Sequence, residues 1–260
     1  MRIGLYSLFL IGSILVGHGQ DMQSENLSYL KGAIVRGDST RPVLSLIFTG
    51  DQFGDGAKHI RKTLKQEEVL ASFFLTGNFY SNPKFTRIIK KLYGDGHFLG
   101  AHSNRHLLYC DWVQRDSLLV SKEEFKHDLL ENYGKMKEFG IEKEEARYFL
   151  PPYEWYNDSI AKWTANLGFL LVNMTHGTLS HADYTTPAMK NYRSSTEIFQ
   201  SIIRFEEQNS SGLNGFLLLM HIGTDPTRTD KLYHYLGPLI KHLKKRGYQF
   251  ERIESLLDVN

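Results

Sequence analysis

Two histidines four residues apart carry the strongest local signal for chemistry in this chain. They are His102 and His106 in the segment AHSNRH, which follows an apolar run typical of a β-strand. If a helical turn begins there, both imidazoles lie on one face, within reach of a single metal ion. Ser103 can cap that turn. The alternative is a pair of surface histidines, but the position at a strand end favours metal binding.

A divalent ion needs a further ligand, and Asp51 in the segment IFTGDQ is a carboxylate at the end of another predicted strand. Two histidines and one carboxylate leave positions open for water and substrate, as a catalytic metal requires. Such an ion activates water and polarises a carbonyl group, which suits the hydrolysis of an amide or ester. On local grounds alone, Asp51 could equally be a turn residue beside Gly50.

A third histidine, His221, lies near the end of the apolar run GFLLLMHI. At the carboxyl end of a strand it could protonate a leaving amine or alcohol, because its charge changes near neutral pH. The alternative is a buried core histidine. Asp225, four residues later, could orient the ring.

The segments that must position these residues alternate between short apolar runs and longer amphipathic stretches, which is typical of βα units and a parallel sheet. Helical patterns occupy residues 59–66, 83–94, 122–140, 157–168, 195–208 and 231–247. Seven strands are predicted, beginning at Val43, Ala71, Phe98, Tyr148, Phe169, Gly215 and Tyr248. We therefore predict a single-domain α/β barrel of about seven parallel strands. Active sites of such barrels lie at the carboxyl ends of the strands.

The composition is that of a globular domain, with 41% hydrophobic and 23% charged residues. Its 31 basic and 29 acidic residues are spread along the chain without a basic stripe. A protein that tracks a phosphate backbone needs such a stripe, so nucleic acid is not an expected partner.

The first nineteen residues have the pattern of a secretory signal peptide: a basic residue at Arg2, an apolar run from Leu5 to Val16, and then small residues. The apolar run is too short to span a membrane comfortably. We expect residues 1–19 to be a signal peptide, residues 20–41 a linker or N-terminal segment, and residues 42–260 the barrel. The protein is then periplasmic or secreted, without stable membrane insertion.

The motifs resemble, in order, those of the polysaccharide deacetylase (NodB-homology) family. AHSNRH matches that family's metal motif, and FLLLMHIG resembles the late motif that ends in the catalytic histidine. The PPY of residues 151–153 resembles the end of an arginine-proline-proline-tyrosine motif. LSLIFTGD occupies the place of the opening threonine-phenylalanine-aspartate-aspartate motif.

The resemblance implies a distorted (β/α) barrel that removes acetyl groups from N- or O-acetylated sugars, with Zn²⁺ or a similar divalent metal as cofactor. Carried over to this chain, it makes Asp51, His102 and His106 the metal ligands and His221 the general acid. The backbone N–H of Tyr153 becomes a candidate donor to the oxyanion.

Two departures from the family pattern concern the general base. The family's opening motif has a base aspartate followed by a ligand aspartate, whereas this chain has Thr49, Gly50 and then Asp51. Assigning Asp51 as the ligand needs a one-residue shift and leaves the base unassigned. Leu150 replaces the arginine that orients the base. The candidate substitutes are Asp51 itself, Asp55, Glu154 and a distant residue.

Several aromatic residues fall on the expected active-site loops, and flat aromatic faces pack well against sugar rings. They are Tyr109, Trp112, Tyr153, Trp155 and Tyr156. We predict substrate contacts from Pro152, Tyr153, Glu154 and Trp155; the alternative is ordinary loop packing. In the long connection 175–193, Asp183 and Tyr184 resemble the family's aspartate and tryptophan that support the catalytic histidine.

The sequence therefore predicts a metal-dependent deacetylase acting on an acetylated glycan, with Asp51 and His221 as its catalytic residues. One alternative is a carbohydrate-binding relative that kept the metal site and lost the general base. Another is a metal-dependent hydrolase of a different ester or amide on the same scaffold.

Overall fold

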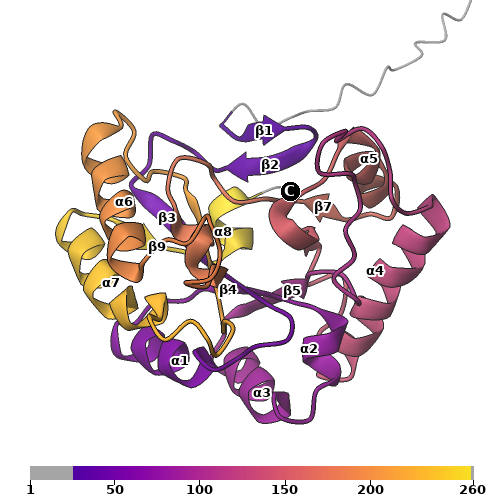
Figure 1. Ribbon diagram of the computed structural model, residues 1–260, viewed down its shortest axis with the longest axis horizontal. Coiled ribbons are helices and arrows are strands. Elements are labelled where there is room, and N and C mark those ends of the chain that lie inside the picture. Colours follow the sequence, from indigo (N-terminus) through magenta and orange to yellow (C-terminus); the bar gives the residue numbers. More distant parts are fainter. Residues whose placement is uncertain (1–25, 259–260) are drawn as a thin grey trace, which may run out of the picture.

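The computed structural model describes residues 26–258, and the expected signal peptide lies outside these residues. A parallel sheet of seven strands forms the centre (Figure 1), with the order β7-β6-β5-β4-β3-β8 and β9 beside β3. The strands are β3 (Val43–Gly50), β4 (Ser72–Leu75), β5 (Phe98–Ala101), β6 (Tyr148–Phe149), β7 (Leu170–Leu171), β8 (Leu217–His221) and β9 (Gln249–Phe250). The seven predicted strands and the barrel-like α/β fold are thus confirmed.

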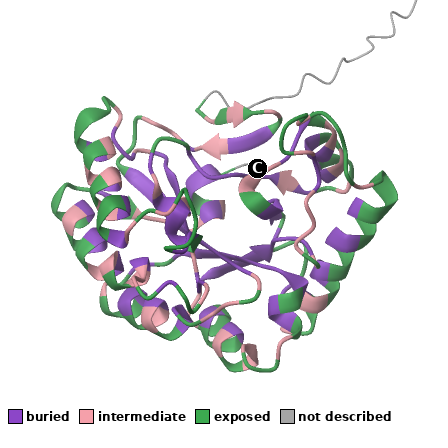
Figure 2. Ribbon diagram, viewed as in Figure 1, coloured by how far each residue is buried: buried purple, intermediate pink, exposed green. Residues whose placement is uncertain are grey.

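The long central strand β3 is buried along its whole length. Its sequence, VLSLIFTG, is a nearly continuous apolar run rather than an alternating one, because helices and loops cover both faces of a parallel sheet. Figure 2 shows the sheet as a buried centre, with helices that turn their exposed faces outward.

Helices pack around this sheet. They are α1 (Ala57–Gln66), α2 (Gly77–Ser81), α3 (Thr86–Gly94), α4 (Lys122–Lys137), α5 (Asp158–Asn166), α6 (Ser195–Gln208), α7 (Leu236–Lys245) and α8 (Ile253–Leu257). The six predicted helical patterns correspond to α1 and to α3 through α7. Short 3₁₀ helices occur at η1 (Pro152–Glu154), η2 (Ser180–Tyr184) and η3 (Leu232–Tyr235). Between residues 26 and 258, no helix has both the length and the apolar character needed to cross a membrane.

Part of the segment expected to be a linker forms an antiparallel hairpin, β1 (Ser28–Leu30) with β2 (Ala33–Arg36). Strand β2 lies between the two edges of the parallel sheet: Ile34 bridges to Val172 after β7, and Arg36 bridges to Phe216 before β8. The backbone N–H of Asn173 donates to the Ile34 carbonyl at 2.9 Å. The hairpin therefore spans the gap between the edge strands, and its buried residues belong to the core.

Candidate active site

A pocket of about 610 Å³ lies at the carboxyl ends of the parallel strands. Strands β3, β5, β6, β7 and β8, or the segments that follow them, supply its lining, as the barrel prediction requires. The carboxylate and imidazole side chains that the sequence analysis singled out and that line it are Asp51, His102, His106, Glu154, His221 and Asp225. The fold thus brings together residues that are up to 174 positions apart in the sequence.

His102 is held in one tautomer. Its Nδ1 lies 2.8 Å from the carbonyl oxygen of Leu150. Because a carbonyl can only accept, Nδ1 carries the proton and Nε2 keeps its lone pair. Burial lowers the pKa of His102 well below its ordinary value, so the ring is neutral. A neutral imidazole with a free Nε2 is the form that binds a metal.

The segment around the two histidines is a loop, so the prediction of a helical turn was wrong. Ser103 and His106 both have left-handed backbone conformations, with φ of +72° and +57°. The two imidazole rings nevertheless come within 5.1 Å of each other, centroid to centroid. The Ser103 hydroxyl still accepts a hydrogen bond from the backbone N–H of Leu107 at 3.3 Å.

Two buried side chains of α4 hold this loop in place, and the sequence analysis did not identify them. Asp128 accepts hydrogen bonds from the Ser103 hydroxyl at 2.5 Å and from the backbone N–H groups of Asn104 and Arg105 at 2.9 and 3.0 Å. Asn132 accepts from the backbone N–H of His102 at 2.9 Å. Their spacing of one helical turn places both on the face of α4 that meets the loop.

Asp51 follows β3 and is oriented by two residues that follow β4. Its Oδ1 accepts hydrogen bonds from the Thr76 hydroxyl at 2.8 Å and the Asn78 amide at 3.1 Å. Within the described residues Oδ2 has no hydrogen-bond donor. The charge of Asp51 acts on His106, where it opposes the lowering of the pKa by burial. Asp51 therefore faces the histidine loop with one oxygen free.

Two imidazoles and one carboxylate are a known donor set for a catalytic zinc ion. The free Nε2 of His102 and the free Oδ2 of Asp51 fit that use. In residues 26–258, however, no three His, Cys, Asp or Glu side chains stand close enough together to hold an ion without movement. Metal binding by Asp51, His102 and His106 thus requires a shift of side chains.

His221 is oriented by Asp183, in the 3₁₀ helix η2. The His221 Nδ1 lies 2.6 Å from Asp183 Oδ1, and the His221 backbone N–H donates to Asp183 Oδ2 at 2.9 Å. Burial alone would lower the pKa of His221, but the charge and hydrogen bond of Asp183 outweigh it and raise the pKa. The proposed role of Asp225 was wrong, because that carboxylate accepts hydrogen bonds from Thr227 instead.

Thr49 is the residue that the family resemblance, matched without a gap, puts in place of the first aspartate. It pairs in register with His221 on the neighbouring strand, is 1% exposed, and its hydroxyl has no hydrogen-bond partner in the described part of the chain. Leu150 is fully buried. Asp55 is absent from the pocket lining: it pairs with Lys231 at 3.0 Å and accepts from the backbone N–H of Thr224 at 2.8 Å. Asp55 therefore ties two loops together and is not available as a base.

The loop after β6 has an unusual backbone. Tyr153 and Glu154 are consecutive left-handed residues with φ of +60° and +53°, a conformation that costs energy for residues other than glycine. The Asn173 amide donates to the Glu154 carbonyl at 2.8 Å. Tyr153 and Glu154 line the pocket, whereas Pro152 and Trp155, the other predicted substrate contacts, do not.

Trp155 instead supports the neighbouring loop. Its indole N–H donates to the Asp111 carbonyl at 3.1 Å, and the Arg115 guanidinium lies 4.0 Å from its ring centroid. This anchoring leaves Trp112 on the pocket rim, 54% exposed, with its ring centroid 5.5 Å from that of Tyr153. The other two predicted aromatic residues, Tyr109 and Tyr156, are fully buried and belong to the core.

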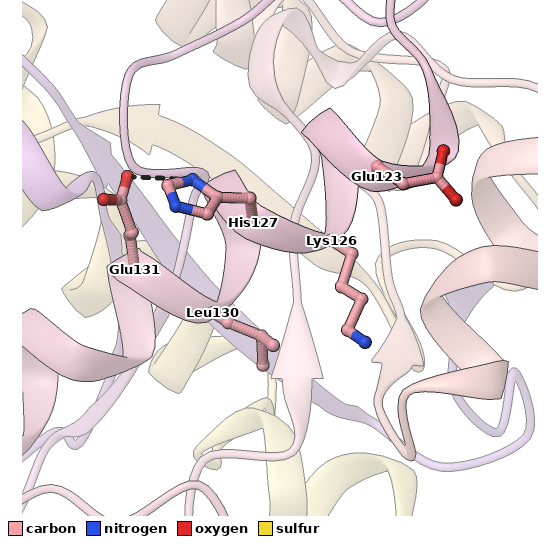
Figure 3. A pocket seen from close by; sticks show the side chains of 5 residues that line it. All are labelled: Glu123, Lys126, His127, Leu130 and Glu131. Atoms are coloured by element: carbon pink, nitrogen blue, oxygen red, sulfur yellow. Dashed lines mark ion pairs between the residues drawn. The ribbon is translucent and has the colours of Figure 1, made fainter.

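A separate hollow of about 480 Å³ lies on the outer face of α4 (Figure 3). Its walls are side chains of one helix: Glu123, Lys126, His127, Leu130 and Glu131. The His127 and Glu131 pair, 3.5 Å apart, is exposed. No strand end contributes to this hollow, so we assign the chemistry to the pocket at the carboxyl edge.

Comparison with known proteins agrees with this fold and site. A family model for polysaccharide deacetylases matches residues 36–172, just over half of the chain. The chain therefore belongs to the polysaccharide deacetylase family. The match ends before His221, which is placed in the site by its position in the pocket lining and its contact with Asp183.

Individual relatives are distant. The peptidoglycan-N-acetylmuramic acid deacetylase PdaA of Bacillus subtilis is 22% identical over 230 residues, which cover 86% of this chain and 75% of the relative. The crystal structure of a peptidoglycan N-acetylglucosamine deacetylase has a TM-score of 0.69 at 21% identity, covering 87% of this chain and 92% of that one.

Another solved structure is that of a CE4 family pseudoenzyme from Bacillus anthracis. Its TM-score is 0.68 at 20% identity, and the match covers 88% of this chain and 70% of that one. A mutant of this pseudoenzyme with restored enzymatic activity has the same TM-score. The fold is thus shared by active and inactive relatives.

Proposed function

We propose that this protein is a metal-dependent deacetylase that hydrolyses acetyl groups on an N- or O-acetylated glycan. The observation that carries the proposal is the Asp183–His221 pair, which faces the same pocket as His102, His106 and Asp51. An oriented acid and a potential metal site in one pocket are the parts that acyl hydrolysis requires.

Asp51, His102 and His106 would hold the ion, for which Zn²⁺ is the best match to two imidazoles and a carboxylate. When bound, such an ion supplies polarisation of the acetyl carbonyl and activation of a water molecule. Asp51 is prepared for this role by the donors on its Oδ1, and His102 by the Leu150 carbonyl.

His221 would act as the general acid. Asp183 accepts from Nδ1–H, so the proton available for transfer in the imidazolium is the one on Nε2. That proton passes to the nitrogen or oxygen of the leaving sugar as its bond to the acetyl carbon breaks. The backbone N–H of Tyr153, which has no hydrogen-bond acceptor in the described residues, would donate to the developing oxyanion.

The substrate class we propose is an acetylated cell-wall or other structural glycan. Support comes from the relatives named as peptidoglycan deacetylases, and from Trp112 and Tyr153 on the pocket rim, which suit a sugar ring. We also propose that the protein is exported and works in the periplasm or outside the cell. The basic and apolar pattern of residues 1–19 supports this.

A second candidate is a carbohydrate-binding relative without catalytic activity. The observation that favours it is the pair of changes at Thr49 and Leu150, which remove an acid and its arginine partner together.

Acetate release from acetylated xylan, chito-oligosaccharides and peptidoglycan fragments distinguishes a deacetylase from a non-catalytic carbohydrate-binding protein. We expect release by the wild type with Zn²⁺ and a loss of about 100-fold or more in His221→Ala. Binding of these glycans without acetate release from any of them would favour the non-catalytic candidate.

A further inference from the structure

The pocket contains three acidic side chains in the described part of the chain, namely Asp51, Glu154 and Asp225. Asp51 receives two hydrogen bonds on one oxygen, and its charge acts on His106. Asp225 accepts two hydrogen bonds from Thr227, and these lower its pKa. A carboxylate whose pKa is lowered is a poor proton acceptor.

Glu154 differs from both. Within residues 26–258 no hydrogen bond reaches its carboxyl group, so both oxygens are available to a water molecule in the pocket. It lies close enough to His221 and Asp183 for their charges to act on it. Burial in the pocket wall raises the pKa of Glu154 to about 7. A group with that proton affinity can take up and release a proton near neutral pH.

The backbone holds Glu154 in this position at an energetic cost. Its φ of +53° follows the +60° of Tyr153, and the Asn173 amide fixes its carbonyl. Strained backbone of this kind is concentrated at functional sites, where surrounding structure over-determines it. The two left-handed residues place the Tyr153 N–H and the Glu154 side chain on one short turn, and the Glu154 carboxyl lies near His221.

We propose that Glu154 is the general base of this enzyme, in place of the aspartate that Thr49 replaces. This inference rests on the proposed deacetylase function. By the family resemblance, Thr49 and Leu150 stand where the family has an acid and an arginine; both are buried, and the Thr49 hydroxyl has no hydrogen-bond partner in the described residues.

In the reaction, the Glu154 carboxylate takes one proton from water while the water oxygen forms a bond to the acetyl carbon. The carbonyl π electrons move to its oxygen. As this oxyanion collapses, the bond from the acetyl carbon to the sugar nitrogen or oxygen breaks, and His221 gives its Nε2 proton to that atom. Acetic acid leaves and ionises, the proton on Glu154 returns to His221 through water, and one water has been consumed for each acetyl group.

The test compares Glu154→Gln with the wild type and with Glu207→Gln, a matched change at an exposed glutamate of α6. Metal content and unfolding temperature are measured for each protein, and kcat and KM are measured with acetylated xylan and chito-oligosaccharide. We expect Glu154→Gln to lower kcat by about 100-fold or more with little change in KM. We expect its metal content to match that of the wild type.

A double variant, Thr49→Asp with Glu154→Gln, restores a carboxylate at the position that is in register with His221. We expect the kcat of this double variant to be at least about tenfold higher than that of Glu154→Gln. If the wild type is active and Glu154→Gln retains its full kcat, the assignment of Glu154 is overturned and the deacetylase function stands. If the wild type is inactive with metal bound and only proteins carrying Thr49→Asp release acetate, both proposals are overturned.

Discussion

Asp183 contacts His221 with both of its carboxylate oxygens, one on the ring and one on the backbone. The ring contact is 2.6 Å and the backbone contact is 2.9 Å, and the Asp183 side chain is only 3% exposed. The two contacts together fix the position of the strand end and the tautomer of the ring. Asp183 thus fixes the tautomer of His221, as the Leu150 carbonyl fixes the tautomer of His102.

Replacing Asp183 with Asn should lower the pKa of His221, because burial is then opposed only by the smaller effect of the Glu154 charge. The alkaline limb of the kcat profile, where the acid loses its proton, is expected to move to lower pH. We also expect kcat at neutral pH to fall by about tenfold or more. The measurement is a pH–rate profile for both proteins, with Asp225→Asn as the comparison. An unmoved alkaline limb in Asp183→Asn would contradict the role given to this pair.

Removing the Asp128 carboxylate should destabilise the protein and loosen the histidine loop. The change Asp128→Ala leaves the Ser103 hydroxyl and two backbone N–H groups without acceptors. We expect a loss of about 3 kcal/mol in the free energy of unfolding and a fall in metal affinity of roughly 10- to 100-fold. Urea unfolding and metal titration measure these, with Glu123→Ala on the exposed face of α4 as control. Equal stability of the two variants would show that the loop does not depend on Asp128.

Removing the Trp112 ring should weaken binding of long substrates without slowing the chemical step. This side chain is half exposed on the pocket rim beside Tyr153. For Trp112→Ala we expect KM for an acetylated oligosaccharide to rise by about tenfold, as the loss of about 1 kcal/mol or more of ring packing implies. We expect kcat to change by less than about twofold. Steady-state kinetics test this against Val113→Ala at the exposed neighbouring position; a drop in kcat with unchanged KM would refute a binding role.

The raised pKa of Glu154 has a consequence for stability. The folded state holds the proton more tightly than the unfolded chain, since the pKa rises from 4.5 to about 7. The resulting stabilisation is therefore present below pH 4.5 and is lost as the pH rises through 7. In the metal-free protein, Glu154→Gln should exceed the wild type in stability by about 1–3 kcal/mol at pH 8 and by much less at pH 5. Urea unfolding at the two pH values measures the difference, and a pH-independent difference would contradict the raised pKa.

The fold followed from the sequence wherever a segment carried a clear pattern. Strand β3 was evident from its continuous apolar run, and α6 from the helical pattern of residues 195–208. The hairpin of residues 28–36 was taken for part of a linker, because strands of three and four residues are too short to show a period. The burial of Ala33 and Ile34 comes from the edges of the sheet, which lie far away in the sequence.

The site was predictable where a residue type and a strand end coincided, as at Asp51, His102 and His221. It was not predictable where a partner arrives from another element. Asp128 and Asn132 lie in a helix whose apolar periodicity is weak, so nothing in its sequence indicated a buried polar face. Asp183 is different: its place beside His221 was indicated by the resemblance of Asp183 and Tyr184 to the family's supporting pair, and the structure confirms the contact. Nearness in the sequence alone pointed to Asp225, which does not contact the ring.

The central claim is tested most directly by the metal content of the purified protein. It is measured, together with acetate release, for the wild type, Asp51→Ala and His102→Ala. The account predicts about one divalent ion per wild-type chain, its loss in both variants, and a parallel loss of acetate release. A wild-type protein that releases acetate without metal, or that binds no metal at all after exposure to Zn²⁺, would contradict it.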